Sequence, residues 1–169
     1  MKQKAIVYTS NTGFTKRYAE LLGKKLGLPI YELEEAEKKL SKDSKVIYMG
    51  WLMANTVKSV VSAMGSFNVI AVCGVGLCET GTAIEEVRAM NRFKSDLPVF
   101  TLQGGMDRKK LKGLNKFMIW MLERGLKKAK NPTDDDKKKL ELISTGGDFV
   151  SEENLAAVIE WYTNDRKQG

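Results

Sequence analysis

The chain of 169 residues contains no histidine and only two cysteines, Cys73 and Cys78. Two cysteines are too few for a disulfide framework, and a chain without histidine has few ligands for a zinc or iron centre, so we expect no metal site. No side chain has an unperturbed pKa near neutrality that would suit general acid or base catalysis. Chemistry is therefore expected to come from a bound cofactor.

Long apolar runs are also missing. The run Phe117 to Leu122 has six residues, far fewer than the roughly 20 that span a bilayer. The apolar stretch from Ala5 to Tyr8 is too short for the core of a signal peptide. These absences, together with the few cysteines, lead us to expect a protein of the reducing cytoplasm.

Apolar residues make up 43% of the chain and charged residues 29%, and the length suits one domain over residues 1–169. Short apolar runs alternate with helical patterns, which predicts an α/β fold with parallel strands joined by crossover helices. The predicted strands cover residues 5–8, 30–33, 46–49, 69–73 and 98–102. The predicted helices cover residues 14–26, 34–42, 56–64, 80–93 and 151–164, the last with Ser151 as its N-cap.

The loop between the first predicted strand and helix is rich in polar groups. It reads Thr9, Ser10, Asn11, Thr12, Gly13, Phe14 and Thr15. A helix N-terminus offers free N–H groups and a partial positive charge, and hydroxyls can donate to the remaining oxygens of a phosphate. Neither a Walker A sequence nor a G-x-G-x-x-G fingerprint is present. The loop predicts a phosphate site without a lysine; the alternative is that its hydroxyls only form a turn and cap the helix.

Four of these residues, Ser10, Thr12, Gly13 and Thr15, match the T/S-x-T-G-x-T fingerprint of flavodoxins. The chain resembles that family, and the order of its strands and helices agrees over the whole length. The resemblance implies a doubly wound sheet of five parallel strands in the order 2-1-3-4-5. It also implies FMN as cofactor, at the carboxyl ends of strands one, three and four.

The resemblance implies two further flavin loops. The loop after strand three contains Gly50, Trp51, Leu52, Met53, Ala54 and Asn55. Trp51 would stack on the isoalloxazine; the alternative is a core tryptophan at a strand end. The loop after strand four contains Gly74, Val75, Gly76, Leu77 and Gly81, whose glycines would let the backbone contact the pyrimidine edge. This second loop lacks an aromatic residue, which would leave one flavin face open to a substrate, and Cys78 within it is expected to be a small apolar residue without a redox role.

The net charge of +7 comes from one segment. Residues 108–130 carry nine basic residues and one acidic residue, Glu123, whereas the rest of the chain carries 19 basic and 20 acidic residues. With its apolar run, this segment resembles the insertion after strand five in menaquinone-dependent protoporphyrinogen oxidase. We therefore expect residues 106–147 to form a helical and loop insertion, with Asp134 to Lys139 as a solvated loop.

At helical spacing the insertion has an apolar stripe, made of Leu111, Leu114, Met118, Met121 and Leu122 and widened by Phe117 and Trp120. This pattern predicts a helix that either packs on its own domain or lies in a membrane interface.

Three functions fit these features. The first is an FMN oxidoreductase that passes electrons from a reduced donor to an acceptor such as quinone, at a membrane surface. The second is a soluble flavodoxin-type electron carrier, although carriers are usually acidic because their partners are basic. The third is a module that binds nucleic acid, which we do not expect because no aromatic-studded strand surface accompanies the basic segment.

Overall fold

Five parallel strands form the central sheet of the computed structural model, which describes residues 4–168 and, for residues 166–168, the backbone alone. The strand order is β2-β1-β3-β5-β6. The strands are β1 (Lys4–Thr9), β2 (Ile30–Glu32), β3 (Lys45–Met53), β5 (Asn68–Gly76) and β6 (Val99–Gln103). This confirms the predicted order of the five strands and is the topology of the flavodoxin-like fold.

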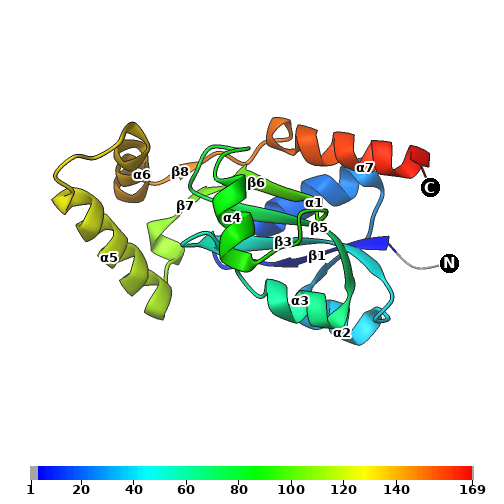
Figure 1. Ribbon diagram of the computed structural model, residues 1–169. Helices are drawn as coiled ribbons and strands as arrows, with labels where there is room; N and C mark the ends of the chain where they lie inside the picture. The colour runs from blue at the N-terminus through cyan, green and yellow to red at the C-terminus, as the bar shows by residue number, and fades with distance from the viewer. Residues whose placement is uncertain (1–3, 169) are drawn as a thin grey trace.

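Helices cover both faces of the sheet (Figure 1). One face packs against α2 (Leu33–Lys39), α3 (Val60–Ser66) and α4 (Ile84–Asn91), and the other against α1 (Phe14–Leu26) and α7 (Ala156–Gln168). The inward side chains of β3 show the division, because Tyr48 belongs to the first core and Ile47 to the second. A strand that is apolar on both faces is expected to lie in the middle of a parallel sheet.

The insertion after β6 is helical, as predicted. It contains β7 (Gly105–Met106), η1 (Arg108–Lys110), α5 (Gly113–Lys128), α6 (Asp134–Thr145) and β8 (Gly147–Asp148), and the short helix η2 (Glu153–Leu155) then leads into α7. Met106, Leu142 and Ile143 form a small core of their own, against which Ile119 and Leu126 of α5 pack. The antiparallel pair β7 and β8 joins the two ends of the insertion.

The prediction of a loop over Asp134–Lys139 was wrong. These residues begin α6, because Thr133 and Asp136 form a capping box: the Thr133 hydroxyl accepts from the Asp136 N–H at 3.1 Å, and the Asp136 carboxylate accepts from the Thr133 N–H at 2.9 Å. Three acidic residues in the first turn also face the positive end of the helix dipole.

The helix predicted over residues 56–64 is present as α3 (Val60–Ser66), but its predicted start at Thr56 was wrong. Strand β3 continues to Met53, and the chain turns back to form β4 (Thr56–Val57), antiparallel to the end of β3. The Val57 side chain is buried, and its N–H donates to Asn91 Oδ1 at 2.9 Å, which holds β4 in an extended conformation.

Other helix limits differ by a few residues. The predicted helices 34–42, 80–93 and 151–164 are shorter or shifted in the structure, at Leu33–Lys39, Ile84–Asn91 and Ala156–Gln168. Ser151 does not cap α7 directly, because η2 intervenes; its hydroxyl instead accepts from the Asn154 N–H at 3.4 Å. Across residues 4–168, the helices are all too short or too polar to cross a membrane.

Candidate functional site

The pairing of the strands brings the predicted loops together at the carboxyl edge of the sheet. Thr9 is paired with Gly50, and Gly50 with Gly74, so β1, β3 and β5 end side by side. Between these ends and the insertion lies a cavity of about 410 Å³, within the range of about 300–1,000 Å³ that is typical of small-molecule sites. Residues of all three predicted loops line it: Ser10, Asn11, Thr12, Phe14, Thr15, Trp51, Leu52, Met53, Ala54, Asn55, Val75, Gly76 and Leu77.

Hydroxyl groups at the start of α1 face this cavity. The Thr15 side chain is almost fully buried, at 1% exposure, yet it lines the cavity. Within residues 4–168, the side chains of Asn11, Thr12 and Thr15 form no hydrogen bond, whereas Ser10 Oγ accepts from the Gly13 N–H at 3.2 Å. The N–H groups in the first turn of a helix also have no acceptor within the helix. The loop therefore offers polar groups that an anion could satisfy.

Gly13 gives this loop its shape. Its φ of 100° lies in a region that side chains rarely adopt, and the chain turns there directly into α1. Gly13 itself faces a neighbouring cavity and not the one that Thr15 lines.

The loop after β3 is a tight hairpin. Ala54 and Asn55 form its two-residue turn, with φ values of 46° and 62°, and the partners Met53 and Thr56 flank them. Positive φ at both central residues is the hallmark of a type I′ turn. Trp51 precedes the turn, lines the cavity and has Lys58 Nζ 5.9 Å from its ring centre. This turn carries Trp51 to Asn55 along one wall of the cavity.

Two glycines of β5 serve packing inside the protein. A Cβ atom on Gly74 or Gly76 would come within 2.8 or 3.1 Å of the Leu52 side chain. The β3 hairpin thus packs against the β5 glycines, and Gly74 is buried beneath it.

Five predicted site residues lie outside the cavity lining: Thr9, Gly13, Gly50, Gly74 and Gly81. The Thr9 hydroxyl lies 2.9 Å from the Tyr48 hydroxyl, which itself donates to the Lys58 carbonyl at 2.7 Å, so Thr9 is the donor to Tyr48. Gly50 is enclosed, because a Cβ there would lie 2.7 Å from Val57 Cγ1. Gly81 is exposed, and its N–H donates to the Thr101 carbonyl.

The insertion supplies a wall that sequence reasoning did not assign to the site. Its lining residues, with one from the β5 loop, are Cys78, Gly105, Met106, Leu111, Asn115, Met118, Ile119, Leu122 and Lys139. Three of these, Met118, Ile119 and Leu122, are apolar residues of α5. Their apolar spacing was visible in the sequence, but its direction depends on how the insertion folds back over the sheet.

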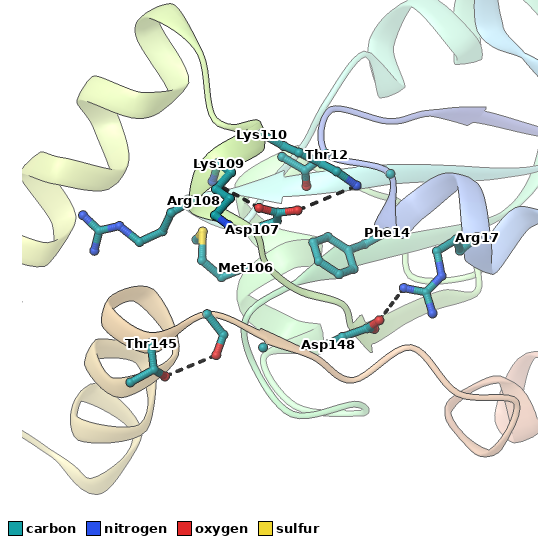
Figure 2. Close-up of a pocket in the computed structure, with 13 residues that line it drawn as sticks. Thr12, Phe14, Arg17, Met106, Asp107, Arg108, Lys109, Lys110, Thr145 and Asp148 are labelled. Carbon is teal, nitrogen blue, oxygen red and sulfur yellow. Dashed lines mark hydrogen bonds and ion pairs between the residues drawn. The ribbon is translucent and has the colours of Figure 1, made fainter.

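A second cavity, of about 580 Å³, lies on the other side of the Thr12–Phe14 turn (Figure 2). Its wall includes an ion pair between Arg17 and Asp148 at 2.5 Å, which joins α1 to β8. Asp107 Oδ1 accepts from the Lys109 N–H at 3.1 Å, and Arg108 turns toward α5 to bind Glu123 (Figure 2). Of these contacts, the Arg17–Asp148 pair connects the insertion to α1, and an exposed ion pair of this kind contributes at most about 1 kcal/mol.

Two buried groups that can lose a proton, the Tyr48 phenol and the Cys73 thiol, predict that the free energy of unfolding falls at alkaline pH. Burial raises the pKa of Tyr48 from 10.0 to about 12, and burial raises the pKa of Cys73 from 9.0 to about 12. The unfolded chain therefore releases these protons first as the pH rises. The stabilising effect of Cys73 is complete below about pH 9 and that of Tyr48 below about pH 10, and both are lost by about pH 12, on the order of 4 kcal/mol for Cys73 and 3 kcal/mol for Tyr48.

Urea denaturation between neutral pH and pH 11 measures this loss. In Cys73→Ala, which cannot ionise at this position, the free energy of unfolding should be lower at neutral pH and should fall less steeply above pH 9. A slope identical to that of the wild type would contradict the assignment of the alkaline loss to this buried thiol.

Comparison with known proteins adds little to this geometry. No family model matches the chain, and no curated protein matches it. A solved structure, that of a candidate flavoprotein from Bacteroides eggerthii, matches with 14% identity and a TM-score of 0.38, and covers 73% of this chain and 98% of its own. The fold assignment therefore rests on the strand order, and the site on the residues described above.

Proposed function

We propose that this protein is a flavoprotein that binds FMN in the 410 Å³ cavity, with the phosphate at the start of α1. The observation that carries the proposal is the set of polar side chains, Asn11, Thr12 and Thr15, at a helix N-terminus on the carboxyl edge of the sheet, which form no hydrogen bond with any described residue. A dianionic phosphate would accept hydrogen bonds from these groups and from the first-turn N–H groups. The site also lies beside β1 and β3, where ligands bind in folds of this strand order.

The rest of the cavity suits a flat ring system. Trp51, Leu52 and Val75 lie on the side of the sheet, and Met118 and Ile119 lie on the side of α5. Apolar walls with polar groups at one end are typical of cofactor sites. These residues would orient the isoalloxazine and exclude water from it.

The chain's own residues favour chemistry on the cofactor. Cys78 and Lys139 are the only titratable side chains among the cavity-lining residues within the described part of the chain. Bound FMN would supply the transfer of one or two electrons, and the protein would bind and orient it.

We further propose an oxidoreductase whose electron acceptor is an apolar ring such as a quinone. The support is the α5 wall, because Met118, Ile119 and Leu122 place an apolar surface opposite the sheet end of the cavity. A soluble electron carrier is the second candidate. It would need an acidic partner, since residues 108–130 are strongly basic.

The test of cofactor identity is titration of the flavin-free protein with FMN, FAD and riboflavin, followed by absorbance and flavin fluorescence. We expect FMN to bind at least about 100-fold more tightly than riboflavin, because only FMN carries the phosphate. Preference for FAD, or equal affinity for FMN and riboflavin, would contradict the proposed phosphate site. Reoxidation of the reduced holoprotein by a soluble quinone, compared with a one-electron acceptor protein, then separates the two candidates.

Trp51 is expected to stack on the flavin. Trp51→Ala should weaken FMN binding by on the order of 1 kcal/mol beyond the loss of buried area, the usual contribution of aromatic pair geometry. FMN should also quench tryptophan fluorescence in the wild type and much less in Trp51→Phe. Trp161→Phe is the matched control, because Trp161 packs against Phe100, away from the cavity. If quenching follows Trp161 and not Trp51, the stacking assignment is wrong.

A further inference from the structure

The outer face of α5 exposes large apolar side chains. Leu114 is 71% exposed, Met121 55%, Phe117 52% and Trp120 48%. The rings of Phe117 and Trp120 stack, with centroids 5.8 Å apart. The predicted single stripe is therefore divided: its members Leu111, Met118 and Leu122 line the cavity, whereas the other four, which we call the outer apolar face, are exposed to solvent.

Basic residues border the outer apolar face at both ends. They are Lys109, Lys112 and Lys116 on one side and Arg124, Lys128 and Lys130 on the other, all exposed. None of these six forms an ion pair with another residue in the described range 4–168. The Arg124 guanidinium lies 5.4 Å from the centre of the Trp120 ring. Meanwhile Glu123, the one acidic residue of the segment, is buried and already pairs with Arg108 and Lys127.

The helix also stands at one end of the molecule. In Figure 1, α5 lies beyond the carboxyl edge of the sheet, far from the last turns of α7. The four exposed apolar side chains of the outer apolar face therefore belong to a helix at one end of the molecule.

We propose that α5 docks on an anionic lipid bilayer, with the outer apolar face in the interface and the basic residues against the headgroups. Trp and Phe favour this depth, and lysine stems extend along an apolar surface while their charges stay in water. A second copy of this chain is disfavoured as the occupant, since it would bring a segment of the same high positive charge against this one. An acidic protein partner is the other outcome that the test distinguishes.

Docking would bring the flavin cavity close to the membrane, because the inner side of the same helix lines that cavity. This consequence rests on the proposed function; the docking itself does not, since it uses residues on the opposite side of α5.

The test is sedimentation of the full chain, with and without FMN, with vesicles that contain phosphatidylcholine alone or roughly one-third phosphatidylglycerol. We expect binding to the anionic vesicles at low salt, release in about 1 M salt, where the screening length is about 3 Å, and weak binding to the neutral vesicles. Brominated acyl chains should quench the fluorescence of Trp120, a signal lost in Trp120→Phe.

Two pairs of variants test whether vesicle binding depends on the α5 surface or on nonspecific apolar and ionic contacts elsewhere on the protein. Phe117→Ser with Trp120→Ser should weaken vesicle binding by about tenfold or more, whereas Val61→Ser with Met90→Ser, at 81% and 57% exposure on α3 and α4, should not. Lys116→Gln, Arg124→Gln and Lys128→Gln together should reduce binding and its salt dependence, and Lys24→Gln, Lys42→Gln and Lys94→Gln, at exposed positions elsewhere, should not.

Four outcomes of these experiments would contradict bilayer docking by α5 or the proposed function. Wild-type protein that ignores anionic vesicles at low salt excludes bilayer docking, and so does equal loss in the α5 variants and their controls. A complex with an acidic protein that depends on Phe117 and Trp120, without vesicle binding, would assign the surface to that partner. Failure of FMN binding with intact vesicle binding would refute the proposed function alone.

Discussion

Replacement of Thr12 and Thr15 by valine is expected to abolish most of the affinity for FMN while leaving riboflavin binding nearly unchanged. Each lost hydrogen bond to a charged phosphate costs about 1.5–3 kcal/mol, so the double variant should bind FMN roughly 10² to 10⁴ times more weakly. Valine has nearly the shape of threonine, and neither hydroxyl bonds to another residue within 4–168. The fold should therefore tolerate both changes.

The comparison of two ligands makes this experiment specific. A variant that merely distorted the cavity would weaken FMN and riboflavin alike, and that result would refute the assignment of the phosphate to this loop. Thr163→Val is the matched protein control: Thr163 is exposed on α7, and its hydroxyl donates to the Ile159 carbonyl of its own helix. It should bind both ligands as the wild type does.

Gly105→Ala is expected to be strongly destabilising, although it adds a single methyl group. A Cβ atom there would lie 2.3 Å from the Gly147 carbonyl oxygen and 2.7 Å from the Phe14 ring. The backbone of β8 cannot yield as a flexible side chain could, so the pair β7–β8 must separate. Overpacking of this kind costs about 1–3 kcal/mol and occasionally more. FMN binding should weaken as well, because Gly105 and Phe14 both line the cavity.

Gly125→Ala is the matched control, and it is expected to raise the free energy of unfolding where Gly105→Ala lowers it. Gly125 lies within α5, and a Cβ atom there would meet nothing within 4 Å. Alanine in a helix is favoured over glycine by about 0.5–1 kcal/mol, so this variant should be slightly more stable than the wild type in urea denaturation. Equal stability of the two variants would show that β7 and β8 are not held together at Gly105.

The central sheet could be predicted because its signals are local. Apolar runs such as Val46–Met49 show burial on both faces, and the polar loop after Tyr8 marks the start of a helix. The hairpin at Ala54 and Asn55 could not be predicted, because neither residue is the glycine that such turns prefer. The capping box at Thr133 and Asp136 was readable from sequence, but the charge run after it was interpreted as a loop.

The site was predicted along the sheet and missed along the insertion. Ser10 and Thr12 come soon after β1, and Trp51 lies in the last part of β3, so strand order alone places them at one edge. Asn115, Met118 and Ile119 reach the same cavity only through the tertiary packing of α5. A helical pattern shows which residues share a face, but not which neighbour that face meets.

The pairing of Met106 with Gly147 also has a topological meaning. It closes a loop of roughly 40 residues whose ends meet as neighbours, and the entropy of closing such a loop rises only slowly with its length. In the topology of the fold, the whole insertion therefore has the role of the loop in a hairpin, because the antiparallel strands β7 and β8 hold its two ends together. This connection could be lengthened, exchanged or removed without changing the order of the strands in the central sheet, and a two-residue turn placed between β7 and β8 would leave that sheet without the insertion.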